Sequence, residues 1–248
     1  MYLIVIAAAL VLFIPFRIVP LVRNFTASEV HAAVDPDAIK GLRVNSVEAA
    51  IIVKPAIDRG ISFEITGRNA GSYTLDVDRK GDYAEVSIER RRFTGFLFSG
   101  TPVLEISLPP GSIELAELKT VSGRITLEEP DIPHLQAATV SGSISTTGGR
   151  TESYDLRSTS GRIRLESVSA RGTLRTVSGR IETEVEQLVG DLSFTTVSGR
   201  MTAVFQDTNP FRYDLKTVTG NIRNERSHES DGAYLVTMKS TSGTITLQ

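Results

Sequence analysis

The sequence predicts an all-β protein: a parallel β-solenoid, or β-helix, of about seven coils of roughly twenty residues, preceded by an irregular N-terminal β region and a membrane helix. Three observations lead to this fold class. A sequence motif, seen most clearly at residues 174–181, occurs seven times at intervals of 18 to 23 residues. Apolar and polar residues alternate on both sides of each copy's glycine, which is typical of strands. A Ser-Gly or Thr-Gly turn dipeptide separates the two alternating runs.

The glycine of each copy is expected at a corner between two strands. Glycine adopts positive φ without strain, and its missing Cβ lets successive corners stack closely. Apolar residues stand five positions before and two positions after it, so a bend at the corner would turn both inward. The expected structural corners are Gly123, Gly142, Gly161, Gly179, Gly199, Gly220 and Gly243.

We expect the coils to stack in chain order, since a single coil cannot bury its apolar side. Residues 111–248 form the predicted repeat domain, and residues 25–110 the N-terminal β region that caps it. The last copy, residues 239–248, stops inside its second strand, so its edge is predicted to be open. End-to-end homo-association, a fold-over of the insert at residues 224–232, or another chain would cover it.

Residues 1–24 are predicted to be a membrane anchor. Residues 2–22 are apolar apart from Arg17 and are about long enough to cross a bilayer as a helix. A cleavable signal peptide and a buried core helix are the alternatives. We expect a membrane-anchored protein with the repeat domain outside the cytoplasm, although Arg17 and Arg23 after the run favour the opposite orientation.

Composition gives no indication of catalysis or of nucleic-acid binding. The formal net charge of −2 gives no bulk electrostatic case for nucleic-acid binding, and the absence of cysteine excludes thiol chemistry. The three histidines are scattered, and no glycine-rich nucleotide loop occurs. We therefore predict no catalytic residues, no metal site and no cofactor. A broken acidic ladder five residues after the glycines is interpreted as a solvated edge: Glu128, Glu166, Glu184 and Glu225.

Basic residues recur at two repeat positions, one residue after the glycine and four residues before it. In stacked coils, neighbours at one repeat position lie about 4.8 Å apart, so such rows could hold a repeating anion. Charges that keep exposed strands soluble are the simpler explanation. The candidate anion-binding residues are Arg124, Arg162, Arg180, Arg200, Arg157 and Arg175. Three arginines beside three phenylalanines at residues 90–98 could plug the first coil or contact a membrane or partner.

The order of these segments along the chain resembles that in a known protein family. Residues 104–110 read Leu-Glu-Ile-Ser-Leu-Pro-Pro, and copies of Thr-Val-Ser-Gly-x-Ile follow them. This sequence is similar to the bacterial putative-adhesin family, the DUF4097 family of β-strand-repeat proteins, over roughly residues 42–248. The resemblance implies a β-solenoid on the cell envelope, often membrane-anchored, without established catalytic residues. Many members carry Asp after the glycine, where this chain mostly has Arg.

Taken together, these observations predict a membrane-anchored cell-envelope module for adhesion, binding or structure. Its expected partners are the membrane and either an anionic envelope polymer or a membrane protein, not nucleic acid. One alternative is a regulatory or envelope-stress accessory protein that docks another membrane protein. The other is a polysaccharide-active β-helix enzyme, for which paired carboxylates would be needed.

Overall fold

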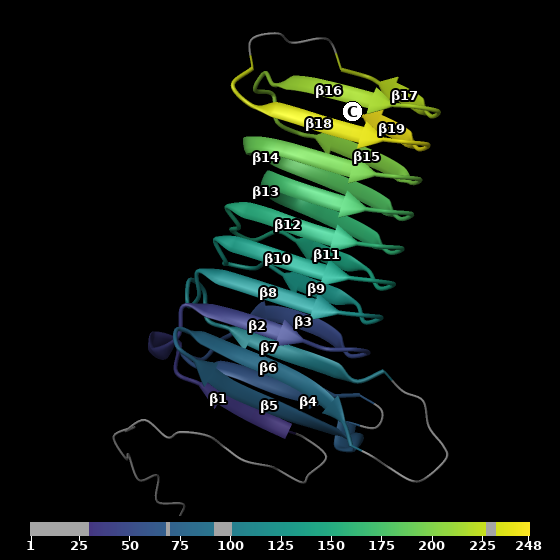
Figure 1. Ribbon diagram of the computed structural model, residues 1–248. Helices are drawn as coiled ribbons and strands as arrows, with labels where there is room; N and C mark the ends of the chain where they lie inside the picture. The colour runs from purple at the N-terminus through teal and green to yellow at the C-terminus, as the bar shows by residue number, and fades with distance from the viewer. Residues whose placement is uncertain (1–29, 68–69, 92–100, 227–231) are drawn as a thin grey trace, which may run out of the picture.

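The computed structural model describes residues 30–67, 70–91, 101–226 and 232–248, and these residues form one tall stack of strands (Figure 1). The N-terminal part contains β1 (Val30–Val34), β2 (Gly41–Asn45), β3 (Ala50–Pro55), β4 (Ile61–Thr66), β5 (Tyr73–Lys80), β6 (Tyr83–Arg90) and β7 (Val103–Leu108). Two short 3₁₀ helices, η1 (Pro36–Ala38) and η2 (Ala70–Ser72), lie between these strands.

The repeat region contains twelve more strands in the described residues. They are β8 (Leu115–Thr120), β9 (Ile125–Glu128), β10 (His134–Thr139), β11 (Ile144–Thr147), β12 (Ser153–Ser158), β13 (Arg162–Thr176), β14 (Arg180–Thr196), β15 (Arg200–Phe205), β16 (Arg212–Thr217), β17 (Asn221–Asn224), β18 (Leu235–Ser240) and β19 (Thr244–Leu247).

Two parallel ladders make up most of the stack. The strand that precedes each corner pairs with its equivalents in the order β6, β2, β8, β10, β12, β13, β14, β18, β16. The strand that follows each corner pairs in the order β7, β3, β9, β11, β13, β14, β15, β19, β17. The long strands β13 and β14 belong to both ladders, with register shifts where they cross from one to the other.

The prediction of a simple parallel β-solenoid is wrong, because the 19 described strands form one mixed sheet. Antiparallel pairs join β1 to β4, β4 to β7 and β5 to β6 at the N-terminal end. The connection between β5 and β6 explains why this pair is antiparallel. Only Gly81 and Asp82 link Lys80 to Tyr83, and Gly81 has a φ of 63°. A two-residue turn can only return the chain antiparallel to itself.

The stacking order also departs from the chain order at both ends. The strands β2 and β3 lie between the β6–β7 and β8–β9 layers. The last copy, β18 and β19, lies between the β14–β15 layer and the β16–β17 layer, which Figure 1 shows at the top of the stack. The prediction that the last copy is the open end is therefore wrong. The side chains of Ile245 and Leu247 are fully buried, whereas Ile222 of β17 is 44% exposed.

An arginine fastens the outermost layer to the layer two steps below. Arg226 follows β17, and its guanidinium donates to the carbonyl oxygens of Phe205 at 2.6 Å and Asp207 at 3.2 Å. The same group lies 4.9 Å from the ring centroid of Phe211, which packs against Phe205. These contacts bridge past the inserted β18–β19 layer.

One hydrophobic core fills the space between the two ladders, and residues on both sides of position 110 contribute to it. The positions five before and two after the glycine point inward, as at Leu174 and Ile181, both completely buried. The predicted anchor at residues 1–24 lies outside the described residues, as does most of the arginine–phenylalanine segment at residues 90–98. Among the described residues, no helix combines the length and apolarity needed to cross a membrane.

Candidate binding edge

The seven Ser-Gly or Thr-Gly corners line up along one edge of the stack, here called the corner edge. They follow one another in the order Gly123, Gly142, Gly161, Gly179, Gly199, Gly243 and Gly220. A Cβ atom added to any of them would lie 1.6–2.1 Å from the carbonyl oxygen of the corner before it in the stack. None of the seven has a positive φ. The conformational reason given for these glycines is therefore wrong, and the close approach of successive corners is what excludes a side chain.

A buried hydroxyl three residues before the glycine closes each of the first four corners. The oxygens of Thr120, Thr139, Ser158 and Thr176 accept hydrogen bonds from the glycine amides at 2.8–3.1 Å. These hydroxyls satisfy amides that the sharp bend removes from the ladders. Ser or Thr stands at this position in all seven copies, a signal that the sequence analysis missed.

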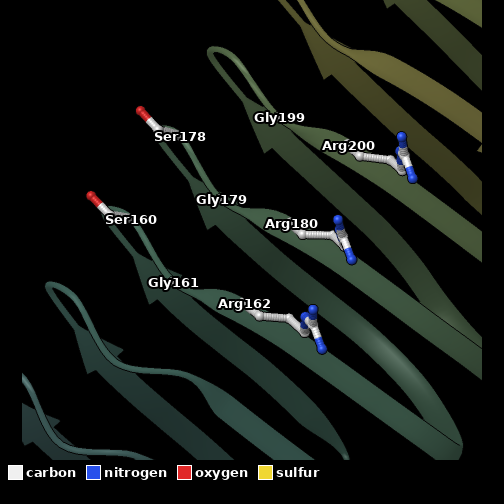
Figure 2. A pocket seen from close by; sticks show the side chains of 8 residues that line it. All are labelled: Ser160, Gly161, Arg162, Ser178, Gly179, Arg180, Gly199 and Arg200. Carbon is white, nitrogen blue, oxygen red and sulfur yellow. The ribbon is translucent and has the colours of Figure 1, made fainter.

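The residue after the glycine stands at the start of the second strand of each layer, or directly before it in β9 and β11, and points outward. Arg162, Arg180 and Arg200 are direct register partners on β13, β14 and β15. Figure 2 shows their side chains projecting in the same direction beside the line of corners. Arg124 belongs to the same row but is separated from Arg162 by Ser143.

A shallow, open cleft of about 410 Å³ lies over these corners. It is lined by Ser160, Gly161, Arg162, Ser178, Gly179, Arg180, Gly199 and Arg200 (Figure 2). Glu182 is the carboxylate nearest this row, with contacts of 3.8 Å to Arg162 and 3.3 Å to Arg180. Within the described part of the chain, Arg200 forms no ion pair. Two of the three guanidinium groups therefore share one carboxylate and the third pairs with no described carboxylate, so positive charge remains for an external anion.

The second basic row lies on the strand that precedes each corner. Arg157 and Arg175 are register partners on β12 and β13, and both side chains are exposed. Asp155 binds Arg157 through two hydrogen bonds of 2.9 and 2.7 Å. The other members of this row are Lys119, Lys239 and Lys216.

The corner edge as a whole is strongly positive. From four residues before to one residue after each glycine, the seven copies contain nine lysines and arginines and no aspartate or glutamate. The complete chain has a formal net charge of −2. Carboxylates such as Glu182 and Asp155 stand two positions further from the corner. The repeat therefore separates charge, with cations next to the corner and anions behind them.

The carboxylate ladder shows a different arrangement. Glu166 forms an ion pair of 2.6 Å with Arg164, and Glu225 one of 2.7 Å with Arg223. Glu184 accepts a hydrogen bond of 2.5 Å from Gln206. Three of the four predicted ladder carboxylates, Glu166, Glu184 and Glu225, thus have a local partner of their own. In the described residues, no three His, Cys, Asp or Glu side chains gather as a metal site, and His134 bonds to Ser153 at 2.8 Å.

Comparison with known proteins agrees with this architecture. The family described as Toastrack DUF4097 matches residues 39–248, and the chain belongs to this family. None of the curated proteins matches it.

The chain is similar to several solved structures. A putative adhesin from Bacteroides fragilis is 15% identical, with a TM-score of 0.50, over 89% of this chain and 97% of that chain. A putative lipid binding protein from Parabacteroides distasonis is 11% identical, with a TM-score of 0.42, over 89% and 97% of the two chains. A putative cell adhesion protein from Clostridium sporogenes is 11% identical, with a TM-score of 0.37, over 88% and 97%. Likeness at these identities concerns the fold alone.

Proposed function

We propose that this protein is a non-catalytic binding module of the bacterial cell envelope and that its corner edge binds an anionic envelope polymer. The observation that carries the proposal is the aligned row of Arg162, Arg180 and Arg200, which has one carboxylate among three guanidinium groups. Family membership and the adhesin fold of the Bacteroides fragilis protein support a binding role. Anchoring through residues 1–24, with the strands outside the cytoplasm, is part of the same proposal.

The geometry favours a polymer over a single small anion. An exposed ion pair contributes only about 0.2–1 kcal/mol, so one phosphate or carboxylate on one arginine binds weakly. The strands that carry these register-paired arginines lie about 4.8 Å apart, so a chain of anionic groups can contact several of the arginines at once. The later contacts form within one molecule and benefit from a high effective concentration.

The test compares the full chain with a variant in which Arg162, Arg180 and Arg200 are all changed to Gln. Co-sedimentation with purified teichoic acid or lipopolysaccharide is measured at low and high salt. The wild-type protein should bind at low salt and weaken as salt screens the contact, and the variant should lose most of its binding. A matched control changes Arg59, Arg79 and Arg171 to Gln, which removes the same charge away from the corner edge.

Equal loss in both variants would show that net charge, not the row, controls binding. No binding by the wild-type protein at low salt would refute the proposal. Co-purification of one membrane protein would then favour the regulatory docking alternative, and turnover of an acidic polysaccharide would favour the enzyme alternative.

A further inference from the structure

A row of exposed valines runs along the corner edge between the two basic rows. Five of these valines stand two residues before a corner glycine, and the sixth, Val47, stands two residues before Ala49, on which the Gly123 corner stacks. We call them the valine crest: Val47, Val121, Val140, Val177, Val197 and Val218. Their side chains are 45–77% exposed. Nine large hydrophobic residues are exposed in the described part of the chain, and six of them are on this crest. Exposed apolar surface is therefore concentrated on one edge and not scattered as on an ordinary protein surface.

The backbone holds the members of the crest in line, with Thr159 between Val140 and Val177 and Thr241 between Val197 and Val218. The amide of Val121 donates to the carbonyl of Val47 at 3.2 Å, and the amide of Val140 donates to that of Val121 at 3.1 Å. The same contact joins Val197 to Val177 at 3.2 Å. Val47, Val121 and Val140 are thus each one strand spacing apart, as are Val177 and Val197, and these apolar segments are part of the backbone frame of the stack.

Positive charge flanks the crest on both sides. Two residues before each valine is the row that includes Arg157 and Arg175, and three residues after it is the row of Arg162, Arg180 and Arg200. No carboxylate interrupts the interval between the two rows in the seven glycine copies, whereas Glu48 follows Val47 at the N-terminal end of the crest. An apolar centre with cationic margins is the arrangement by which surface segments bind anionic bilayers.

We infer that the corner edge lies against an anionic lipid bilayer, with the valine crest at the boundary of headgroups and acyl chains and the two basic rows on the lipid phosphates. This inference rests on the anion binding of the proposed function and names the lipid surface as its partner. The long side chains of arginine and lysine can reach phosphates while their methylene groups cover apolar surface.

The charges argue against the other occupants of such a crest. Two copies packed crest to crest would bring their basic rows together, and like charges at close range oppose association. A single row of side chains also falls short of the roughly 800 Å² per partner that a stable dimer buries. A soluble polyanion would use the basic rows but gain nothing from the valines.

The chain itself provides the matched substitution. Thr159 and Thr241 occupy the crest position in two copies, so the corner accepts threonine without change. Changing Val140, Val177 and Val197 to Thr keeps the side-chain shape and removes apolar surface. All three side chains are about half exposed, so the fold should be unaffected, and circular dichroism checks this.

The absence of cysteine allows a single fluorescent reporter. Ser178→Cys, at the tip of a corner (Figure 2), is labelled with an environment-sensitive fluorophore in the full chain. The control reporter is Gln187→Cys, exposed at the opposite edge of the same layer. Each protein is added to or reconstituted in vesicles of phosphatidylcholine, alone or mixed with phosphatidylglycerol. Because the reporter senses its own surroundings, an N-terminal anchor does not by itself produce a signal.

The label at position 178 should shift to the blue and become protected from an aqueous quencher only with phosphatidylglycerol, and the label at position 187 should not change. In the triple threonine background, the lipid concentration needed for half of the shift should rise roughly tenfold. No shift at position 178, an equal shift at both positions, or a shift indifferent to the threonines would overturn the inference. A shift that depends on protein concentration without vesicles would indicate a second copy and also overturn it.

Polyanion binding by the same variants separates this inference from the proposed function. The triple threonine variant should bind soluble teichoic acid or lipopolysaccharide as the wild-type protein does. If polymer binding persists while the vesicle signal is absent, the lipid inference fails and the proposed function stands. If both are absent in the wild-type protein, both fail.

Discussion

The close approach of successive corners predicts that Gly179→Ala will be severely destabilising in the middle of the stack. A Cβ at this position would lie 1.8 Å from the carbonyl oxygen of Gly161 and 2.5 Å from the side-chain oxygen of Thr176. Real Cβ atoms essentially never approach another atom closer than 3.0 Å. The obstructing atoms include backbone of the neighbouring layer, so relief requires the two layers to separate locally by about 1 Å or more.

The cost follows from what that separation breaks. The amides of Val177 and Ser178 donate to Thr159 at 3.2 and 2.9 Å across this seam, and the amide of Arg180 donates to Gly161 at 3.3 Å. Weakening two or three such bonds costs about 1 kcal/mol each. Strain from overpacking adds about 1–3 kcal/mol. We therefore expect a loss of about 3–6 kcal/mol in the free energy of unfolding, a large share of the roughly 5–15 kcal/mol of a typical domain.

Three other glycines serve as controls in urea unfolding followed by circular dichroism. Gly60 has no atom within 4 Å of an added Cβ, so Gly60→Ala should change stability by less than about 0.5 kcal/mol. Gly81 is equally open but has a φ of 63°, so Gly81→Ala should cost about 1 kcal/mol through backbone conformation alone. Gly220 meets Gly243 at 1.8 Å but belongs to the outermost layer, so Gly220→Ala should cost less than Gly179→Ala. If Gly179→Ala costs no more than Gly81→Ala, the close-approach argument is wrong.

Three further predictions concern the core, the stacking order and pH. Thr176→Val should cost about 1–3 kcal/mol in the free energy of unfolding, measured in urea, because it leaves the partly buried amide of Gly179 without its acceptor. Ile245→Ala should lower the free energy of unfolding by about 2–5 kcal/mol and Ile222→Ala by less than about 1 kcal/mol, because the first side chain is fully buried and the second is 44% exposed. A larger loss for Ile222→Ala than for Ile245→Ala would contradict the inserted position of the last copy. A hydrogen bond from Arg43 lowers the pKa of Glu117 from its ordinary value of 4.5. The pair therefore stabilises the fold above pH 4.5, and this stabilisation should decline as the pH falls further. In thermal melts, the melting temperature of Glu117→Gln should fall less over that range than that of the wild-type protein.

The sequence determined the all-β class and the local shape of each repeat. Alternation around each glycine sets which side chains face inward, and the apolar residues at these positions are buried in all layers except the outermost. The family was also evident from the residues, because the repeated motif and the Leu-Pro-Pro segment are local sequence features. The sequence likewise contains the basic rows and the valines between them, as a pattern of residue types at fixed distances from the glycine.

Only the tertiary structure decided the order of the layers and the direction of the terminal strands. All copies of the repeated motif can form nearly equivalent strand pairs, so the motif alone does not specify which copy pairs with which. The contacts of Arg226 with Phe205 and Phe211 join residues far apart in the repeat pattern, and they accompany the insertion of β18 and β19. Two reasons for the corner glycines follow from the sequence, and only the structure separated them: the layers approach closely at every corner, whereas none of the seven glycines has a positive φ.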